Sequence, residues 1–65
     1  FVDSSNIERI GYDSSSSTLR IEFKRNRTYD YTNVPEYIFN ELRNASSVGS
    51  YHARNIKNIY PYTEI

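Results

Sequence analysis

The sequence predicts an α+β fold in which a three-stranded antiparallel β-meander is followed by two short helices packed on one face, in the order β-β-β-α-α. Two observations lead to this prediction. The first half of the chain alternates apolar and polar residues with the period of a strand. After Pro35 the apolar spacing becomes that of amphipathic helices. A chain of 65 residues is expected to form one domain, residues 1–65.

The strands are expected at residues 7–13, 18–24 and 28–34, after a polar lead-in at residues 1–6. Ile7 is out of phase with Ile10, which predicts either a bulge in the first strand or a later start of that strand. The second strand, TLRIEFK, shows the clearest alternation, with apolar residues on one face and charged residues on the other. This pattern is typical of a sheet with one face in water.

The hairpin between the second and third strands decides which way the tyrosines face. A two-residue loop would pair Glu22 with Tyr29 and would place Tyr29 and Tyr31 on the charged face. A three-residue loop ending at Asn26 would pair Ile21 with Tyr29 and would place both rings in the core. The core face is favoured, because the opposite face of the third strand carries only threonines and an aspartate. A hydroxyl at the rim of so thin a core could still contact a ligand.

The helices are expected over residues 33–45 and from 46 to about 59. Asn33 is expected to cap the first helix, with Glu36 completing a capping box. Ser46 or Ser47 is expected to cap the second. The apolar helical residues are Ile38, Phe39, Leu42, Ala45, Tyr51, Ala53, Ile56, Ile59 and Tyr60. The following Tyr-Pro-Tyr sequence is expected to leave an extended tail.

Composition restricts the function classes. Eight basic and eight acidic residues balance to zero net charge, whereas dedicated nucleic-acid binders are usually more basic. The chain has no cysteine and no cluster of metal ligands, so we expect no disulfide, no metal and no cofactor. A lone His52 and unpaired acids predict a protein that is not an enzyme. No apolar run is long enough for a membrane span, and we expect a cytoplasmic location.

Two basic clusters are candidate binding residues, and both also have an ordinary structural interpretation. The candidates are Lys24, Arg25 and Arg27 at the hairpin tip, and Arg54 and Lys57 with Tyr51, Tyr60 and Tyr62 toward the end of the chain. Arg9 and Arg20 could extend the first cluster and Arg43 the second. Clustered cations suit phosphates, and tyrosines suit bases. Alternatively, the first cluster is a solubilising turn, and the second is a solvated helix face with tyrosines in the core.

The chain resembles the KTSC domain family, a small domain found at the C-terminus of some lysyl-tRNA synthetases and as stand-alone bacterial and phage proteins. The resemblance covers nearly the whole chain. It is carried by Ser5, Ile7, Gly11, Tyr12 and Asp13, by Tyr29, Tyr31, Val34 and Pro35, and by Gly49, Tyr51, Ile56, Lys57 and Tyr60. Among these, Gly11, Tyr12, Tyr29, Tyr31, Val34 and Pro35 are interpreted as structural.

The resemblance also implies a function, drawn from the synthetase context. It implies RNA binding, and together with the missing catalytic residues it leads to the hypothesis of a non-catalytic module that binds RNA or another single-stranded nucleic acid. The chain departs from the family pattern at three places. Asn26 stands where a glycine is common, His52 and Ala53 stand where a Phe-Asn pair is usual, and Lys57 stands where an arginine is usual. The alternatives are a protein–protein interaction module or homodimer, using the edge strands of the sheet, and a small nucleotide-binding sponge.

Overall fold

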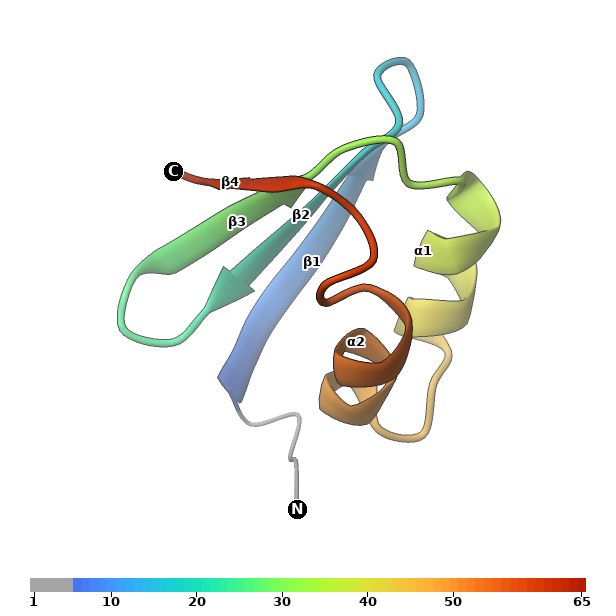
Figure 1. Ribbon diagram of the computed structural model, residues 1–65. Helices are drawn as coiled ribbons and strands as arrows, with labels where there is room; N and C mark the ends of the chain where they lie inside the picture. The colour runs from blue at the N-terminus through green and yellow to red at the C-terminus, as the bar shows by residue number, and fades with distance from the viewer. Residues whose placement is uncertain (1–5) are drawn as a thin grey trace.

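The computed structural model describes residues 6–65 and shows a four-stranded antiparallel sheet with two helices against one face (Figure 1). The elements are β1 (Ile7–Asp13), β2 (Thr18–Phe23), β3 (Arg27–Tyr31), α1 (Glu36–Arg43), α2 (Val48–Asn55) and β4 (Tyr62–Glu64). The strands are hydrogen-bonded in the order β1-β2-β3-β4. The first five residues of the predicted lead-in, with Ser5 of the opening motif, lie outside the described residues.

The α+β class is confirmed, but the prediction of three strands is wrong. The tail after Pro61 adds β4 to the free edge of β3. The backbone amide of Thr32 donates to the Pro61 carbonyl at 2.9 Å, and the amide of Ile65 donates to the Thr28 carbonyl at 2.8 Å. All three β4 residues are exposed, so no apolar alternation marks this strand in the sequence.

The predicted hairpin register is confirmed. Ile21 pairs with Tyr29, and Phe23 pairs with Arg27 across a three-residue loop. Asn26 has the expected left-handed backbone at φ 60°, and Arg25 shares it at φ 68°. The bulge in β1 is also present, because the register shifts between Ile7 and Arg9.

Both helices are shorter than predicted. The prediction that Asn33 caps α1 is wrong: Asn33 is left-handed at φ 60°, and Pro35 occupies the N-cap position without a side-chain hydrogen bond. Ser47 does cap α2, where its hydroxyl accepts from the Ser50 amide. The α2 helix ends at Asn55, and Ile59, expected on its apolar face, is exposed.

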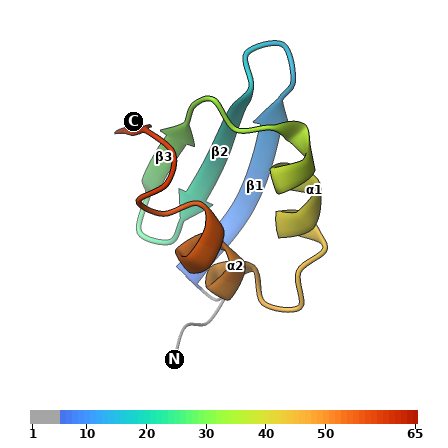
Figure 2. The same cartoon turned by 45° about the vertical axis from the view of Figure 1, so that its right-hand side comes forward.

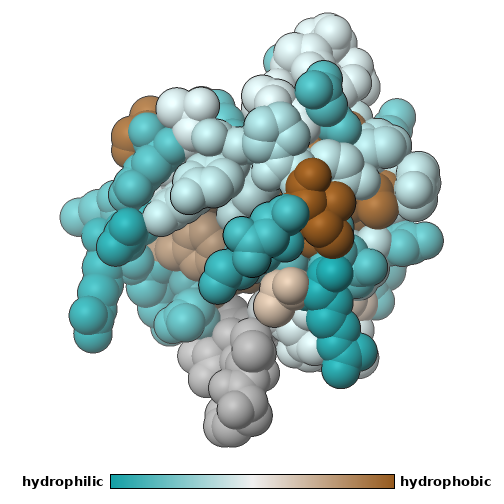
Figure 3. All heavy atoms as spheres, viewed as in Figure 1, coloured by the Kyte–Doolittle hydropathy of each residue, from teal (hydrophilic) through white to brown (hydrophobic). Residues whose placement is uncertain are grey.

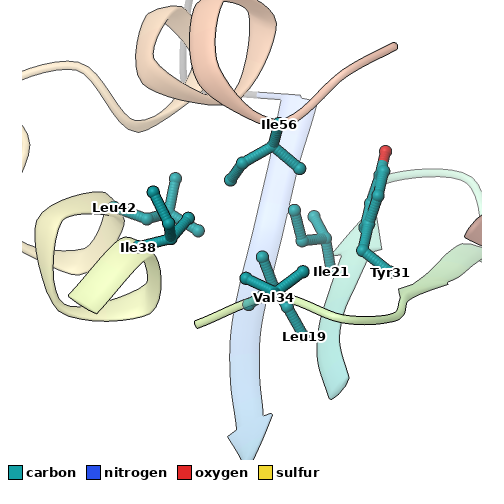
Figure 4. Packing of buried hydrophobic residues seen from close by; sticks show 7 residues of the cluster. All are labelled: Leu19, Ile21, Tyr31, Val34, Ile38, Leu42 and Ile56. Atoms are coloured by element: carbon teal, nitrogen blue, oxygen red, sulfur yellow. The ribbon is translucent and has the colours of Figure 1, made fainter. Parts of the chain in front are cut away.

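The hydrophobic core lies between the sheet and the helices. It consists of Leu19, Ile21, Tyr31, Val34, Ile38, Leu42 and Ile56 (Figure 4). Tyr31 lies at one side of this cluster, with its hydroxyl pointing away from the aliphatic side chains. The helices lie toward the β1 side of the sheet, and the β3–β4 side extends past them (Figures 1 and 2).

Neither helix in the described chain is long and apolar enough to cross a membrane.

Candidate functional site

An open groove of about 800 Å³ lies where the β2–β3 hairpin and β4 extend past α2. Its lining combines cations, aromatic rings and amides: Asn6, Ile7, Phe23, Lys24, Arg25, Arg27, Tyr29, Tyr31, Gly49, His52, Ala53, Lys57, Asn58 and Tyr62. A groove of this size can hold a ligand as large as a nucleotide.

Aromatic rings from three neighbouring strands line one side of the groove. Tyr31 and Tyr62 are paired across β3 and β4, and their ring centroids lie 5.7 Å apart. Tyr29 lies 5.2 Å from Tyr62, and Phe23 meets Tyr29 edge-on at 5.5 Å. Tyr62 is 56% exposed, so its ring is accessible to a planar ligand. Aromatic rings exposed in a basic groove are the platform on which nucleic-acid bases stack.

His52 closes the inner end of the aromatic cluster. Its Nε2 lies 2.8 Å from the hydroxyl oxygen of Tyr31, and its ring meets Tyr31 and Phe23 edge-on. Burial, with a smaller contribution from the charge of Lys57, lowers the pKa of His52. Burial, followed by nearby Tyr29 and Tyr62, raises the pKa of Tyr31 to about 12. A neutral imidazole can therefore accept a hydrogen bond from a protonated Tyr31 hydroxyl.

Arg27 lies at the edge of the groove beside the rings. Pairing with Phe23 places Arg27 on the groove face of the sheet. Its guanidinium donates to the Tyr29 hydroxyl at 3.0 Å and forms an ion pair with Glu64 at 3.3 Å. The hydrogen bond to Tyr29 and the charge of Glu64 raise the pKa of Arg27, so the guanidinium is positively charged at all physiological pH values.

Three further cations line the groove. Lys24 and Arg25 come from the hairpin tip, whereas Lys57 follows α2, and all three side chains are exposed. No ion pair within residues 6–65 involves them. The groove therefore brings together residues more than thirty positions apart in sequence and presents at least three unneutralised positive charges beside exposed rings.

Other predicted binding residues lie outside the groove lining. The Tyr51 hydroxyl donates to Glu41 at 2.6 Å, and burial together with this carboxylate raises the pKa of Tyr51 to about 12. Tyr60 packs against the core, and Arg54 is exposed on α2. Although the second helix was expected to include both Arg54 and Lys57, they do not share a helix face, because α2 ends between them at Asn55.

The remaining predicted cations lie elsewhere. Arg9 and Arg20 form ion pairs with Glu22 and Asp30 on the face of the sheet opposite the groove. The distances are 3.0 Å and 2.7 Å, so these acids neutralise the cations that were expected to extend the hairpin cluster. Arg43 lies over the ring of Phe39 at 5.7 Å.

The motif residues interpreted as structural are located mainly in or beside the core. Val34 is fully buried, and the Tyr12 hydroxyl donates to its carbonyl oxygen at 2.6 Å. The Tyr12 ring also stacks on Phe39 at 5.3 Å. Pro35 is the N-cap of α1, and Gly11 is half-buried in β1. Tyr29 and Tyr31 belong to this set but also line the groove.

Phe23 and His52 are groove residues that the sequence interpretation did not select. Phe23 was identified only as a core residue of the second strand. His52 lies three residues after Gly49 and four before Ile56, the spacing of one helix face. Both Gly49 and Ile56 are buried, so that spacing was a usable signal for a buried histidine. The contact between His52 and Tyr31 depends on tertiary packing, and no pattern in the sequence indicates it.

Comparison with known proteins identifies related sequences. A family model described as KTSC domain matches residues 3–60. A lysine–tRNA ligase from Trichormus variabilis is 36% identical over 59 residues, and one from Nostoc sp. is 34% identical over 59 residues. Each match covers 91% of this chain but only 10% of the ligase, so the chain spans about a tenth of the length of these two relatives.

A solved structure also matches. The crystal structure of a KTSC domain protein from Yersinia pestis has a TM-score of 0.88 and 34% identity, and the match covers 91% of this chain and 83% of that one. A protein from Tsukamurella paurometabola is 40% identical over 50 residues, which cover 77% of this chain and 75% of that protein.

Proposed function

Since the chain belongs to the KTSC domain family, we propose that its groove binds single-stranded nucleic acid, and RNA in particular. In this proposal Lys24, Arg25, Arg27 and Lys57 contact phosphates. The exposed ring of Tyr62, with Tyr29 beside it, stacks on an unpaired base.

The observation that carries the proposal is that cations and exposed rings line the same groove. Phosphate contacts supply the sequence-independent part of nucleic-acid affinity, and stacking on aromatic rings is available only when a base is unpaired. A duplex keeps its bases stacked inside and presents mainly phosphates to a shallow groove. The mixed lining therefore favours a single strand over a duplex.

RNA is preferred over DNA because of the relatives. Two of them are named lysine–tRNA ligases, and this chain matches a segment of each ligase. A small domain that is part of an enzyme acting with tRNA lies close to RNA rather than to DNA. The zero net charge of the chain predicts a weak interaction, concentrated at the groove and sensitive to salt.

A non-catalytic role is part of the proposal. His52, the only histidine, is 8% exposed, and its Nε2 is engaged by the Tyr31 hydroxyl. This contact suits a packing residue better than a general base, which needs access to a substrate proton.

Exposed apolar side chains on the face shown in Figure 3 form separate small patches among hydrophilic ones, so this face does not favour an apolar protein interface.

The test is a backbone amide NMR titration with a single-stranded oligoribonucleotide at low and then physiological salt. We expect shifts at residues 24–27, 57–58 and 62, which shrink as salt rises. The matching duplex should produce smaller shifts at Tyr62. If no amide shifts at low salt, the proposal is wrong. Salt-independent shifts confined to the outer face or the β1 edge would point instead to a partner surface unrelated to the groove.

A further inference from the structure

The segment after Pro61 places a carboxylate on one of the groove cations. Glu64 pairs with Tyr29 across β3 and β4, so its side chain shares the groove face of the sheet. Its Oε2 lies 3.3 Å from Nε of Arg27, and its Oε1 lies 3.5 Å from Nη2. Both carboxylate oxygens therefore face the guanidinium fork, which is the geometry that an arginine also offers to a phosphate.

Arg27 differs in this respect from the other cations that line the groove. Within residues 6–65 it forms an ion pair, whereas Lys24, Arg25 and Lys57 form none. Arg27 also donates to the Tyr29 hydroxyl, which fixes its guanidinium next to the rings. The cation best placed to bind a phosphate next to a stacked base is thus the one whose charge is already neutralised.

The contact is exposed and can be exchanged. The side chains of Arg27 and Glu64 are 56% and 46% exposed. Exposed ion pairs contribute little stability, so a phosphate of comparable geometry can replace the carboxylate at small cost. Main-chain hydrogen bonds along β3 nevertheless keep Glu64 at high local concentration beside Arg27.

We propose that Glu64 is a built-in competitor that occupies the phosphate position on Arg27 and weakens nucleic-acid binding in the groove. The inference rests on the proposed function of the groove and adds its regulation. Glu64 lies beyond residue 60, where the match to the family model ends. The competitor therefore lies in β4, outside the segment that the family model matches. Any change that lifts β4 from the edge of β3 would free Arg27 and raise the affinity.

The test is a double-mutant cycle on binding of a fluorescein-labelled oligouridylate about eight nucleotides long, within the site sizes of small single-strand binders. The proteins are wild type, Glu64→Gln, Arg27→Gln and the double variant, with melting temperatures to verify folding. Glu36→Gln is the matched control: it removes the same charge from an exposed residue that does not line the groove.

We expect Glu64→Gln to tighten binding about twofold to fivefold at low salt, which is the effect that an exposed ion pair can exert. It should also steepen the salt dependence by about 0.7 in the slope of log affinity against log salt, one phosphate contact on a single strand. In the Arg27→Gln background the same substitution should have no more effect than Glu36→Gln.

Three results would overturn the inference, and the last is distinguishable from the first two because it also overturns the proposed function. If wild type binds but Glu64→Gln gains no more than Glu36→Gln, or if its gain survives in the Arg27→Gln background, Glu64 is not a competitor and the groove proposal stands. If neither wild type nor Glu64→Gln binds the oligouridylate, the proposed function and the inference fail together. Binding by Glu64→Gln alone would support the inference most strongly.

Discussion

The hydroxyl of Tyr31 and Nε2 of His52 lie 2.8 Å apart where β3 meets α2. Both residues are nearly inaccessible, with exposures of 3% and 8%. The contact satisfies two buried polar atoms and ties the aromatic side of the groove to the helix. The groove therefore has a fixed inner wall, and the stability of this wall depends on the protonation state of one imidazole.

Stability should fall when His52 takes up a proton. Burial lowers its pKa below the ordinary 6.5, so around and below this pH the unfolded chain binds more protons than the folded one. The contribution of the neutral ring is complete above 6.5 and is lost as the pH falls toward the lowered value. We expect a smaller free energy of unfolding at about pH 5.5 than at about pH 7.5, by at most about 1.4 kcal/mol per pH unit. Urea denaturation at both pH values measures this difference in the free energy of unfolding.

The matched variant for this prediction is His52→Phe, which keeps a ring but cannot titrate. Its free energy of unfolding should vary less between the two pH values than that of the wild type. An equal pH dependence in both proteins would assign the effect to other groups. Asp13 and Asp30, whose pKa values are lowered mainly by hydrogen bonds to Ser15 and Arg20 respectively, lose their contributions only below the ordinary 3.8, outside this window.

Truncation of Tyr31 should destabilise the fold strongly. Its ring is in the core, and large-to-small changes of aromatic core residues cost about 3–5 kcal/mol. Tyr31→Phe should cost only about 1 kcal/mol, because it keeps the ring and leaves the Nε2 of His52 without its partner. Chemical denaturation separates the two variants. A loss below about 1 kcal/mol for Tyr31→Ala would contradict the core position of this ring.

Tyr12→Phe tests a second tyrosine hydroxyl. The Tyr12 hydroxyl donates to the carbonyl of buried Val34 at 2.6 Å and holds the connection before α1 against β1. Removing it should lower the free energy of unfolding by about 1 kcal/mol. Tyr37→Phe is the control, because Tyr37 is 61% exposed and should change stability by less than about 0.5 kcal/mol. Equal effects for both variants would refute a structural role of the Tyr12 hydroxyl.

Lys57 and Arg54 provide a charge-matched comparison for the groove. Both cations are exposed and lie three residues apart, but only Lys57 lines the groove. We expect Lys57→Glu to weaken oligoribonucleotide binding at low salt by roughly fivefold or more and to reduce its salt dependence. Arg54→Glu should have a clearly smaller effect. Fluorescence anisotropy measures both affinities, and a ranking in the opposite order would move the binding surface to the outer side of α2.

Some of the fold could be predicted because the side chains left no alternative. In the third strand one face carries Tyr29 and Tyr31, and the other carries Thr28 and Asp30. Only the first set can contribute to a core, so the pattern fixed the hairpin register before any contact was known. The same pairing implies that Arg27 shares a face with the two tyrosines, although it was interpreted only as a tip cation.

The end of α2 and the strand β4 could not be predicted. The α2 helix stops at Asn55, the Lys57 amide donates to the His52 carbonyl at 2.9 Å, and Asn58 takes a left-handed backbone. This closing turn removes Lys57 from the helix face and brings it into the groove lining. The apolar spacing predicted a helix that continues through Ile59, because the few residues of this turn do not interrupt the spacing of apolar residues.

Three properties could be read from the residues alone: the alternation that makes a meander, the tyrosines that fill a thin core, and the family to which the chain is related. These properties depend on side-chain type and local spacing. The three-dimensional packing was needed to show that the hairpin cations, Lys57 and Tyr62 share one groove and that Glu64 forms an ion pair with Arg27. Tyr62 and Glu64 reach the groove when β4 pairs with the edge of β3, and the turn after α2 brings in Lys57. A strand of three exposed residues gains its hydrogen bonds from its partner and leaves no pattern of its own in the sequence.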